Sequence, residues 1–145
     1  MTTLESLKAT SSTLASTHPK LRLLVLFGSR ARGEADSSSD WDFAFLSDPD
    51  RPSEHKSFWF PGSELLESLS KLLHISYERI DLVDLSTCSD ILAHFVAHDG
   101  QVIYEKTPGE FAQFQQHALK TKAELKQYRH DQREKVVQTL QRWGL

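Results

Sequence analysis

Two aspartates, Asp40 and Asp42, lie one residue apart at the start of an apolar segment, and a Gly28-Ser29 pair precedes them by ten intervening residues. On a β-strand, residues two apart point to the same face, so the two carboxylates would lie side by side and repel each other. Such a pair becomes tolerable when it shares divalent cations, and oxygen ligands suit Mg²⁺. Two metal ions held in this way stabilise both the attacking and the leaving oxygen of a phosphoryl-type transfer.

The Gly28-Ser29 pair would complete such a site by binding phosphate. Gly28 has no Cβ, so its backbone can approach a phosphate closely. Ser29 offers a hydroxyl and a backbone N–H at the start of a helix, which is a ready anion site. Each feature alone is more typical of a solvated strand end or a tight turn. Together, at this spacing, they favour a functional site.

These residues need strands to hold them, and the surrounding pattern predicts strands. The apolar run at 21–27 has the length of a strand and ends abruptly at the Gly-Ser turn, which favours a buried strand. Residues 40–46 alternate, which places three aromatic side chains on one face and the two aspartates on the other. Further strands are predicted at 78–85 and 101–105, and helices at 3–16, 29–35, 63–74 and 90–98, the last opened by a capping box from Thr87 to Asp90.

Residues 108–145 predict one long helix. Thr107 suits its N-cap and Pro108 its first position, and no helix breaker follows between Glu110 and Trp143. At about 1.5 Å per residue it would span on the order of 50 Å, more than a domain of this size is wide. It therefore either folds back and buries its distal apolar cluster or offers that cluster to another chain. The distal cluster comprises Val136, Val137, Leu140 and Trp143, and a proximal stripe comprises Phe111, Phe114, Ala118, Leu125 and Tyr128.

Composition and charge exclude several classes of protein. A length of 145 residues with 39% hydrophobic and 26% charged residues is typical of one soluble globular domain, and no segment suits a membrane span. The formal net charge of −3 divides into −6 over residues 1–107 and +3 over residues 108–145, without the basic stripe of a duplex nucleic-acid binder. The single cysteine, Cys88, and an N-terminal segment without a secretory apolar region predict a cytoplasmic protein.

The motif FGSRARGEADSSSDWDF resembles the signature of the DNA polymerase beta-like nucleotidyltransferase superfamily. Within it, the chain is most similar to the minimal nucleotidyltransferases (MNT), in particular the MntA-type antitoxins of HEPN/MNT toxin–antitoxin modules. The resemblance covers most of residues 20–106. It implies an α+β fold of the polymerase-beta-like type, with a mixed sheet flanked by helices and a long C-terminal helix. Residues 1–107 would form the nucleotidyltransferase core, and residues 108–145 a helix of the same domain that can dock a partner.

The resemblance also implies a reaction. MntA-type enzymes transfer AMP from ATP to a tyrosine hydroxyl of the cognate HEPN ribonuclease toxin, which neutralises the toxin, and they depend on Mg²⁺. Carried onto this chain, Asp40, Asp42 and Asp81 would be the catalytic carboxylates and the ligands of two Mg²⁺ ions. Gly28 and Ser29 would bind the triphosphate of ATP. No membrane and no direct contact with nucleic acid are expected.

Asp81 and Asp84 compete for the place of the third carboxylate. They are three residues apart, so on a strand they face opposite sides. Asp81 lies in mid-strand, where burial of an acid without a role is costly, whereas Asp84 lies near the strand end and can be solvated or cap the next turn. Asp81 is therefore the preferred candidate, and it would also act as the base toward the incoming hydroxyl.

Arg30 and Arg32 follow the Gly-Ser turn, and either guanidinium would suit a triphosphate. Arg30 lies nearer the turn and is the candidate ligand, while the alternative for both is a solvated helix face or pairing with neighbouring acids. His94 and His98 lie four apart on one predicted helix, but they lack the glutamate of a metalloprotease motif and are expected to be partly exposed. The aromatic segment 58–62 either plugs into the core or forms a lip that stacks adenine or contacts a partner.

Two other functions stay open on the sequence alone. A small-molecule nucleotidyltransferase, for example one acting on aminoglycosides, would use the same carboxylates but would need an acceptor pocket built by dimerisation. A non-catalytic binding module would inhibit its partner by covering it. About 100 residues suffice for the nucleotide and the metal ions and leave no second domain to bind a small acceptor, which favours an acceptor brought by a partner protein.

Overall fold

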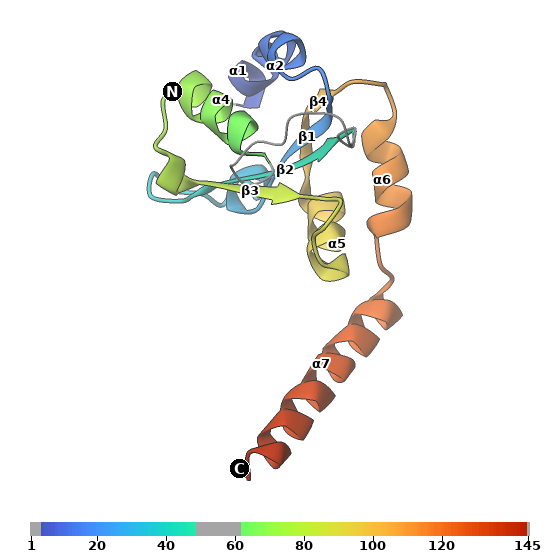
Figure 1. Ribbon diagram of the computed structural model, residues 1–145. Helices are drawn as coiled ribbons and strands as arrows, with labels where there is room; N and C mark the ends of the chain where they lie inside the picture. The colour runs from blue at the N-terminus through green and yellow to red at the C-terminus, as the bar shows by residue number, and fades with distance from the viewer. Residues whose placement is uncertain (1–3, 49–61, 145) are drawn as a thin grey trace, which may run out of the picture.

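The computed structural model describes residues 4–48 and 62–144 of the chain, and its centre is a mixed four-stranded sheet (Figure 1). Across the sheet the strands follow in the order β3 (Ile80–Asp84), β2 (Trp41–Ser47), β1 (Leu21–Phe27) and β4 (Gln101–Glu105). β1 pairs antiparallel with both β2 and β4, and β2 pairs parallel with β3. Within the described residues, β3 and β4 are therefore the edge strands.

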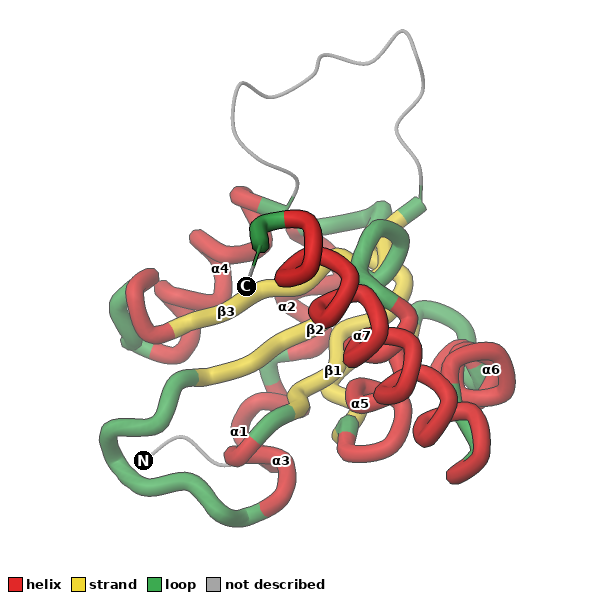
Figure 2. Tube along the Cα trace, turned by 90° about the horizontal axis from the view of Figure 1, so that it is seen from below, coloured by secondary structure: helices red, strands yellow, loops and turns green. Residues whose placement is uncertain are grey.

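Helices cover both faces of this sheet (Figures 1 and 2). One face carries α1 (Leu4–Ala9), α2 (Ser11–Thr17) and α4 (Ser63–Leu73), and the other carries α5 (Asp90–Asp99) and α6 (Glu110–Ala118). The short helix α3 (Ser29–Arg32) follows β1, a 3₁₀ turn, η1 (Tyr77–Arg79), precedes β3, and α7 (Lys122–Arg142) follows α6. Because β1 is covered on both faces, its sequence is a continuous apolar run rather than an alternating one.

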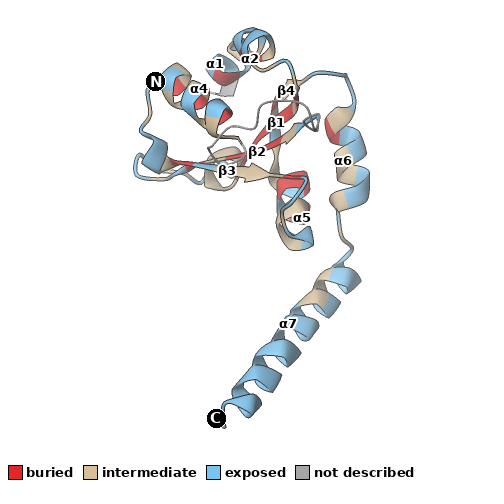
Figure 3. Ribbon diagram, in the orientation of Figure 1, coloured by how far each residue is buried: buried red, intermediate tan, exposed pale blue. Residues whose placement is uncertain are grey.

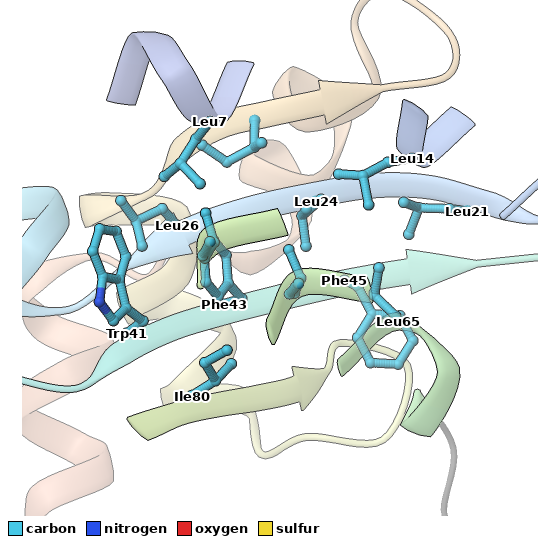
Figure 4. Close-up of a cluster of buried hydrophobic side chains, with 13 residues drawn as sticks. Leu7, Leu14, Leu21, Leu24, Leu26, Trp41, Phe43, Phe45, Leu65 and Ile80 are labelled. Atoms are coloured by element: carbon cyan, nitrogen blue, oxygen red, sulfur yellow. The ribbon is translucent and has the colours of Figure 1, made fainter. Parts of the chain in front are cut away.

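Two hydrophobic clusters, one on each face of the sheet, hold these layers together. In the larger cluster, Trp41, Phe43 and Phe45 of β2 pack against leucines of α1, α2 and α4 (Figure 4). The rings of Trp41 and Phe43 stack with their centroids 6.3 Å apart. Ala44 belongs to the smaller cluster on the opposite face, and the alternation of a strand directs Asp42 to that face too. The predicted division of this strand into an aromatic and an acidic face is confirmed.

Two features of the predicted helices differ in the structure, the continuity of the first helix and the N-cap of α5. The predicted helix at 3–16 is interrupted at Thr10, whose hydroxyl donates to the carbonyl of Leu7 (2.6 Å), and α1 and α2 replace it. The predicted capping box from Thr87 is wrong. Ser89 is the N-cap of α5, because its hydroxyl accepts the N–H of Leu92 at 3.3 Å.

The predicted single helix from residue 108 to Trp143 is also wrong, because α6 and α7 replace it. α6 begins three residues after Thr107, which is therefore not its cap. Leu119 adopts an extended conformation and ends α6. Thr121 then opens α7 with a capping box: its hydroxyl accepts the N–H of Glu124 (3.1 Å), and the Glu124 carboxylate accepts the N–H of Thr121 (3.0 Å).

Helix α7 extends away from the sheet (Figures 1 and 3). None of its side chains is buried by the described part of the chain, and only Leu125 and Tyr128 are half-buried. The distal cluster, Val136, Val137, Leu140 and Trp143, is exposed, so of the two predicted alternatives the structure shows the helix that overhangs. None of the helices that the structure describes is long and apolar enough to cross a membrane.

Candidate active site

Asp42 of β2 and Asp81 of β3 are direct neighbours, because the parallel register pairs these two residues. Residues paired in this way point to the same face of the sheet. Burial of Asp42, the negative charge of Asp81, a hydrogen bond between the two carboxyl groups and the charge of Asp40 raise the pKa of Asp42 to about 6. The two carboxylates repel each other, and a divalent cation between them would relieve this repulsion.

Gly28 brings the end of β1 against this pair. Its φ of +75° is a conformation that residues with a side chain rarely adopt. A Cβ on Gly28 would overlap Oδ2 of Asp42 and would lie 3.0 Å from its Cγ. Glycine is therefore required twice over, by the backbone angle and by the close approach to the carboxylate. Ser29 follows as the first residue of α3, so the Gly-Ser turn adjoins the carboxylate pair.

Asp40 lies directly before β2 and is exposed. Its charge acts on the pKa of Asp42, although less strongly than that of Asp81. In the described part of the chain, no three His, Cys, Asp or Glu side chains are arranged as a ready-made metal site. The donor chemistry nevertheless fits Mg²⁺, which is usually bound through one or two carboxylates together with substrate phosphates rather than in an all-protein cage. Asp42 and Asp81 can supply those carboxylates, and Asp40 is close enough for its charge to act on Asp42.

Asp84 is used differently from Asp81. Its Oδ1 accepts hydrogen bonds from the backbone N–H (2.9 Å) and the hydroxyl (2.6 Å) of Ser86, so it stabilises the turn after β3. In the register it lies opposite Phe45. Burial does not separate the two aspartates as expected: β3 is an edge strand of the described sheet, so Asp81 is exposed while Asp84 is half-buried. The neighbourhood of Asp42, and not burial, distinguishes Asp81.

Arg30 points to the loop that precedes the carboxylates. Its Cζ lies 4.1 Å from the centroid of the Trp41 ring, and its Nη2 donates to the carbonyl of Ser39 (2.7 Å). Arg79 donates to the same carbonyl (3.1 Å) and to that of Ser37 (2.6 Å), although no sequence motif singles it out. The role of Arg30 as a phosphate ligand stays a prediction.

Arg32 is directed toward α5. Its guanidinium pairs with Glu34 at 3.0 Å and with Asp99 of α5 at 3.3 Å. Its positive charge lowers the pKa of Asp42, against the larger effects that raise it. Arg32, which the sequence places second to Arg30, is thus the arginine after the turn whose charge acts on the carboxylate pair.

The remaining sequence candidates lie elsewhere. His94 is buried, contrary to expectation, because its Nδ1 accepts the N–H of Lys120 (3.0 Å) in the α6–α7 connection. His98 is exposed as expected. Cys88 is half-buried near the start of α5, and burial raises the pKa of its thiol. Residues 58–61 lie outside the described part of the chain, so both alternatives for the aromatic segment, the core plug and the lip, stay predictions.

A cavity of about 290 Å³ lies on the other side of β2 from the carboxylate pair. Leu26 and Trp41, which line it, belong to the larger hydrophobic cluster, whereas Asp42 faces the smaller one. Arg30 and Gln101 are its longest polar side chains. This cavity is therefore separate from the site that the carboxylates form.

Comparison with known proteins assigns this site to a family. The family model described as "Polymerase beta, Nucleotidyltransferase" matches residues 10–109, a range that includes the Gly28 turn and the three predicted carboxylates. The chain belongs to the polymerase beta nucleotidyltransferase family. The predicted enzyme class, a nucleotidyltransferase, is thereby confirmed.

A curated relative of this nucleotidyltransferase is protein adenylyltransferase MntA of Aphanizomenon flos-aquae. The two sequences are 39% identical over 149 residues, which cover 99% of this chain and 96% of the relative. The likeness thus extends over nearly the whole of both proteins, C-terminal helices included. It confirms the resemblance to the MntA-type proteins.

Solved structures share the fold of this nucleotidyltransferase. A chain from a toxin–antitoxin crystal structure with AMP-PNP matches 94% of it and 98% of its own length, with a TM-score of 0.61 and 24% identity. A chain from the toxin–antitoxin MntA-HepT matches 96% and 99%, with a TM-score of 0.58 and 22% identity. A chain from the complex of tri-AMPylated Shewanella oneidensis HEPN toxin with MNT antitoxin matches 96% of this chain and 99% of its own length. Its TM-score is 0.58 and its sequence identity is 21%. These structures confirm the predicted α+β, polymerase-beta-like fold class.

Proposed function

We propose that this nucleotidyltransferase is an antitoxin that transfers AMP from ATP to a tyrosine hydroxyl of a HEPN-type ribonuclease toxin and so neutralises it. The observation that carries the proposal is the Asp42–Asp81 pair against the Gly28 turn, in a chain 39% identical to protein adenylyltransferase MntA. Two structural relatives support it, one solved with AMP-PNP and one with an AMPylated HEPN toxin. We place the reaction in the cytoplasm, where ATP is available and the single Cys88 stays reduced.

The residues at the turn and on the two strands have separate tasks. Asp42 and Asp81, together with Asp40, would hold two Mg²⁺ ions. When bound, these ions neutralise the triphosphate and stabilise the attacking and leaving oxygens. The backbone of Gly28 approaches the phosphates closely, and Ser29 donates to them through its hydroxyl and its N–H.

The transfer step moves one phosphorus from ATP to the partner. The tyrosine oxygen of the partner forms a bond to the α-phosphorus, the bond from that phosphorus to the bridging oxygen breaks, and pyrophosphate leaves. Asp81 takes the proton of the tyrosine hydroxyl as the general base. Its exposure at the edge of the described sheet suits this task, because a side chain of another protein can reach it.

The partner brings the acceptor, and α7 binds the partner. α7 carries six basic and three acidic residues, and its distal cluster leaves Trp143 71% exposed. Exposed apolar residues that include a tryptophan are typical of interface hot spots. We assign the distal cluster to the HEPN-type partner, which would be held by α7 while its tyrosine enters the carboxylate site.

ATP labelled at the α-phosphate or at the γ-phosphate tests the proposed reaction. Incubation with Mg²⁺ and the HEPN-type partner should place the α-label, and not the γ-label, on a tyrosine of the partner. Asp42→Asn should remove this labelling, while Asp84→Asn should retain it because Asp84 serves the turn after β3. Transfer of the γ-label, or equal labelling by wild type and Asp42→Asn, would contradict the proposal.

A further inference from the structure

The loop from α3 to β2, residues 33–40, carries Asp40 and has a built-in turn. Oδ1 of Asp36 accepts hydrogen bonds from the N–H (2.8 Å) and the hydroxyl (2.6 Å) of Ser38. The N–H of Ser39 donates to the carbonyl of Asp36 (3.2 Å). These bonds shape residues 36–39 but do not connect the loop to the rest of the chain.

Two arginines connect residues 36–39 to the rest of the chain. Arg30 donates from Nη2 to the carbonyls of Ser39 (2.7 Å) and Asp36 (3.3 Å). Arg79 donates from Nη2 to the carbonyls of Ser39 (3.1 Å) and Ser37 (2.6 Å). The Ser39 oxygen thus accepts from two guanidinium groups, which uses both of its lone pairs. Hydrogen bonds from a charged donor are stronger than those between neutral groups.

The two arginines come from elements that already hold the site. Arg30 belongs to α3 and stacks on Trp41, which is 7% exposed and follows Asp40 directly. Arg79 ends η1 and directly precedes Ile80, the residue paired with Trp41 in the parallel register. Figure 2 shows the loop at the end of the sheet where β2 and β3 begin. The Ser39 carbonyl is therefore fixed between the Gly-Ser turn and the strand that carries Asp81.

We propose that Arg79, together with Arg30, is a positioning residue that holds the Ser39–Asp40 peptide and so keeps the Asp40 carboxylate beside the Asp42–Asp81 pair. Asp40 is exposed, and like charges repel it from that pair, so an unrestrained loop would move it away. Arg30 and Arg79, which together we call the clamp, oppose this movement with two charged hydrogen-bond donors to the Ser39 carbonyl. The inference rests on the proposed function in one respect, namely that Asp40 binds metal.

The test changes Arg79 rather than Arg30, because Arg30 also packs on the core residue Trp41. Arg79→Gln should increase amide hydrogen exchange at residues 37–40 about 5-fold, since these amides lose the anchor of their loop. It should also weaken the binding of Mn²⁺, used as the probe metal without nucleotide, by about 10-fold, as loss of a group that orients a ligand does. Arg79→Lys keeps one charged donor and should restore part of the protection from exchange and part of the Mn²⁺ affinity. Glu78→Gln, exposed on the same turn, is the matched control and should change neither.

The two readouts separate this inference from the proposed function. Exchange and Mn²⁺ affinity that match those of Glu78→Gln would overturn the clamp. A wild-type chain that binds no Mn²⁺ would refute the metal role of Asp40 on which the inference rests. Faster exchange with unchanged Mn²⁺ affinity would overturn the role of the clamp in positioning Asp40. A chain whose Mn²⁺ binding depends on Arg79 but which transfers no AMP to its partner would keep the clamp and refute the proposed function.

Discussion

Two regions of the chain are each incomplete without a ligand or partner, but for different physical reasons: the carboxylate pair on β2 and β3, and the distal cluster of α7. At the pair, burial and crowded negative charge raise the pKa of Asp42 to about 6. At α7, Val136 and Trp143 keep 56% and 71% of their surfaces exposed. The repulsion at the carboxylate pair is electrostatic and confined to a few atoms, whereas the exposed surface of α7 is apolar and extends along a helix.

The surroundings of the two regions show what can satisfy each. The pair lies inside a hydrogen-bonded sheet, with the backbone of Gly28 directly against Asp42, so a small cation and a phosphate are suitable in size and charge. α7 follows the connection at Lys120, and none of its side chains is buried by the described residues, so a protein surface is suitable in size to cover its distal cluster. Changes at the pair should therefore alter chemistry and stability together, and changes at α7 should alter partner binding alone.

The largest effect is expected at the pair. Asp42→Asn should slow AMP transfer about 10³-fold, because in the proposed mechanism it removes a charge that holds the cations where the transition state needs them. The rate of AMP incorporation into the partner measures this effect. Asp84→Asn changes a carboxylate that is bonded to Ser86 in the turn after β3, and it should leave the rate almost unchanged. Similar rates for the two variants would remove the distinction between Asp84 and the pair.

The next effect is expected at α7. Replacing Leu140 and Trp143 together by alanine should weaken binding of the HEPN-type partner about 100-fold, because two exposed apolar anchors are lost. The free energy of unfolding should not change, since neither side chain is buried. Glu134→Ala is the control, because nine residues place Glu134 on the opposite side of the helix from Trp143. Calorimetric titration with the partner measures both affinities. Equal affinities of the double variant and Glu134→Ala would show that the distal cluster does not bind the partner.

A smaller effect is expected where the turn meets the pair. Gly28→Ala should lower the free energy of unfolding by about 2 kcal/mol, because the new methyl group meets the Asp42 carboxylate and φ is +75°. Gly33→Ala has the same φ and no atom within 4 Å of its Cβ among the described residues, but its ψ of 18° lies in the left-handed helical region, so it measures the cost of a positive φ without a steric overlap, about 1 kcal/mol. Denaturant unfolding of both variants gives the difference. A larger loss for Gly33→Ala would contradict the close approach at Gly28.

The smallest effect concerns pH. Because the pKa of Asp42 is raised from 3.8 to about 6 in the folded chain, its stabilising contribution is fully present below pH 3.8 and is lost as the pH rises through about 6. Asp42→Asn has no such loss. Relative to wild type, its free energy of unfolding should therefore rise between pH 4 and pH 7.5, by roughly 1 kcal/mol because solvent screens a half-buried group. A constant difference across this range would show that Asp42 titrates normally.

The parts of the fold that depend on local pattern could be predicted from the sequence. The strands at 21–27 and 101–105 have the predicted bounds, because an apolar run or an alternation ends at a clear turn. The break between α6 and α7 also has a local signal, the capping box from Thr121 to Glu124, but without the structure the continuous helical pattern on both sides outweighs it.

Other features depend on contacts between distant residues and could not be predicted. His94 is buried because the N–H of Lys120 reaches it from 26 residues away. Arg79 meets the carbonyl of Ser39 across 40 residues, with no motif to mark either residue. The exposure of Asp81 follows from the position of β3 at the edge of the described sheet, which no short window of sequence specifies.

The ribonuclease activity of the HEPN-type partner after treatment and separation tests the central claim most directly. The partner is incubated with the chain, ATP and Mg²⁺, separated from the chain, and assayed, and its mass is then measured. We predict a partner that stays inactive and carries AMP on a tyrosine after treatment with wild type, and an active, unmodified partner after treatment with Asp42→Asn. A partner that regains full activity and normal mass after separation from wild type would show inhibition by binding alone and would contradict the account.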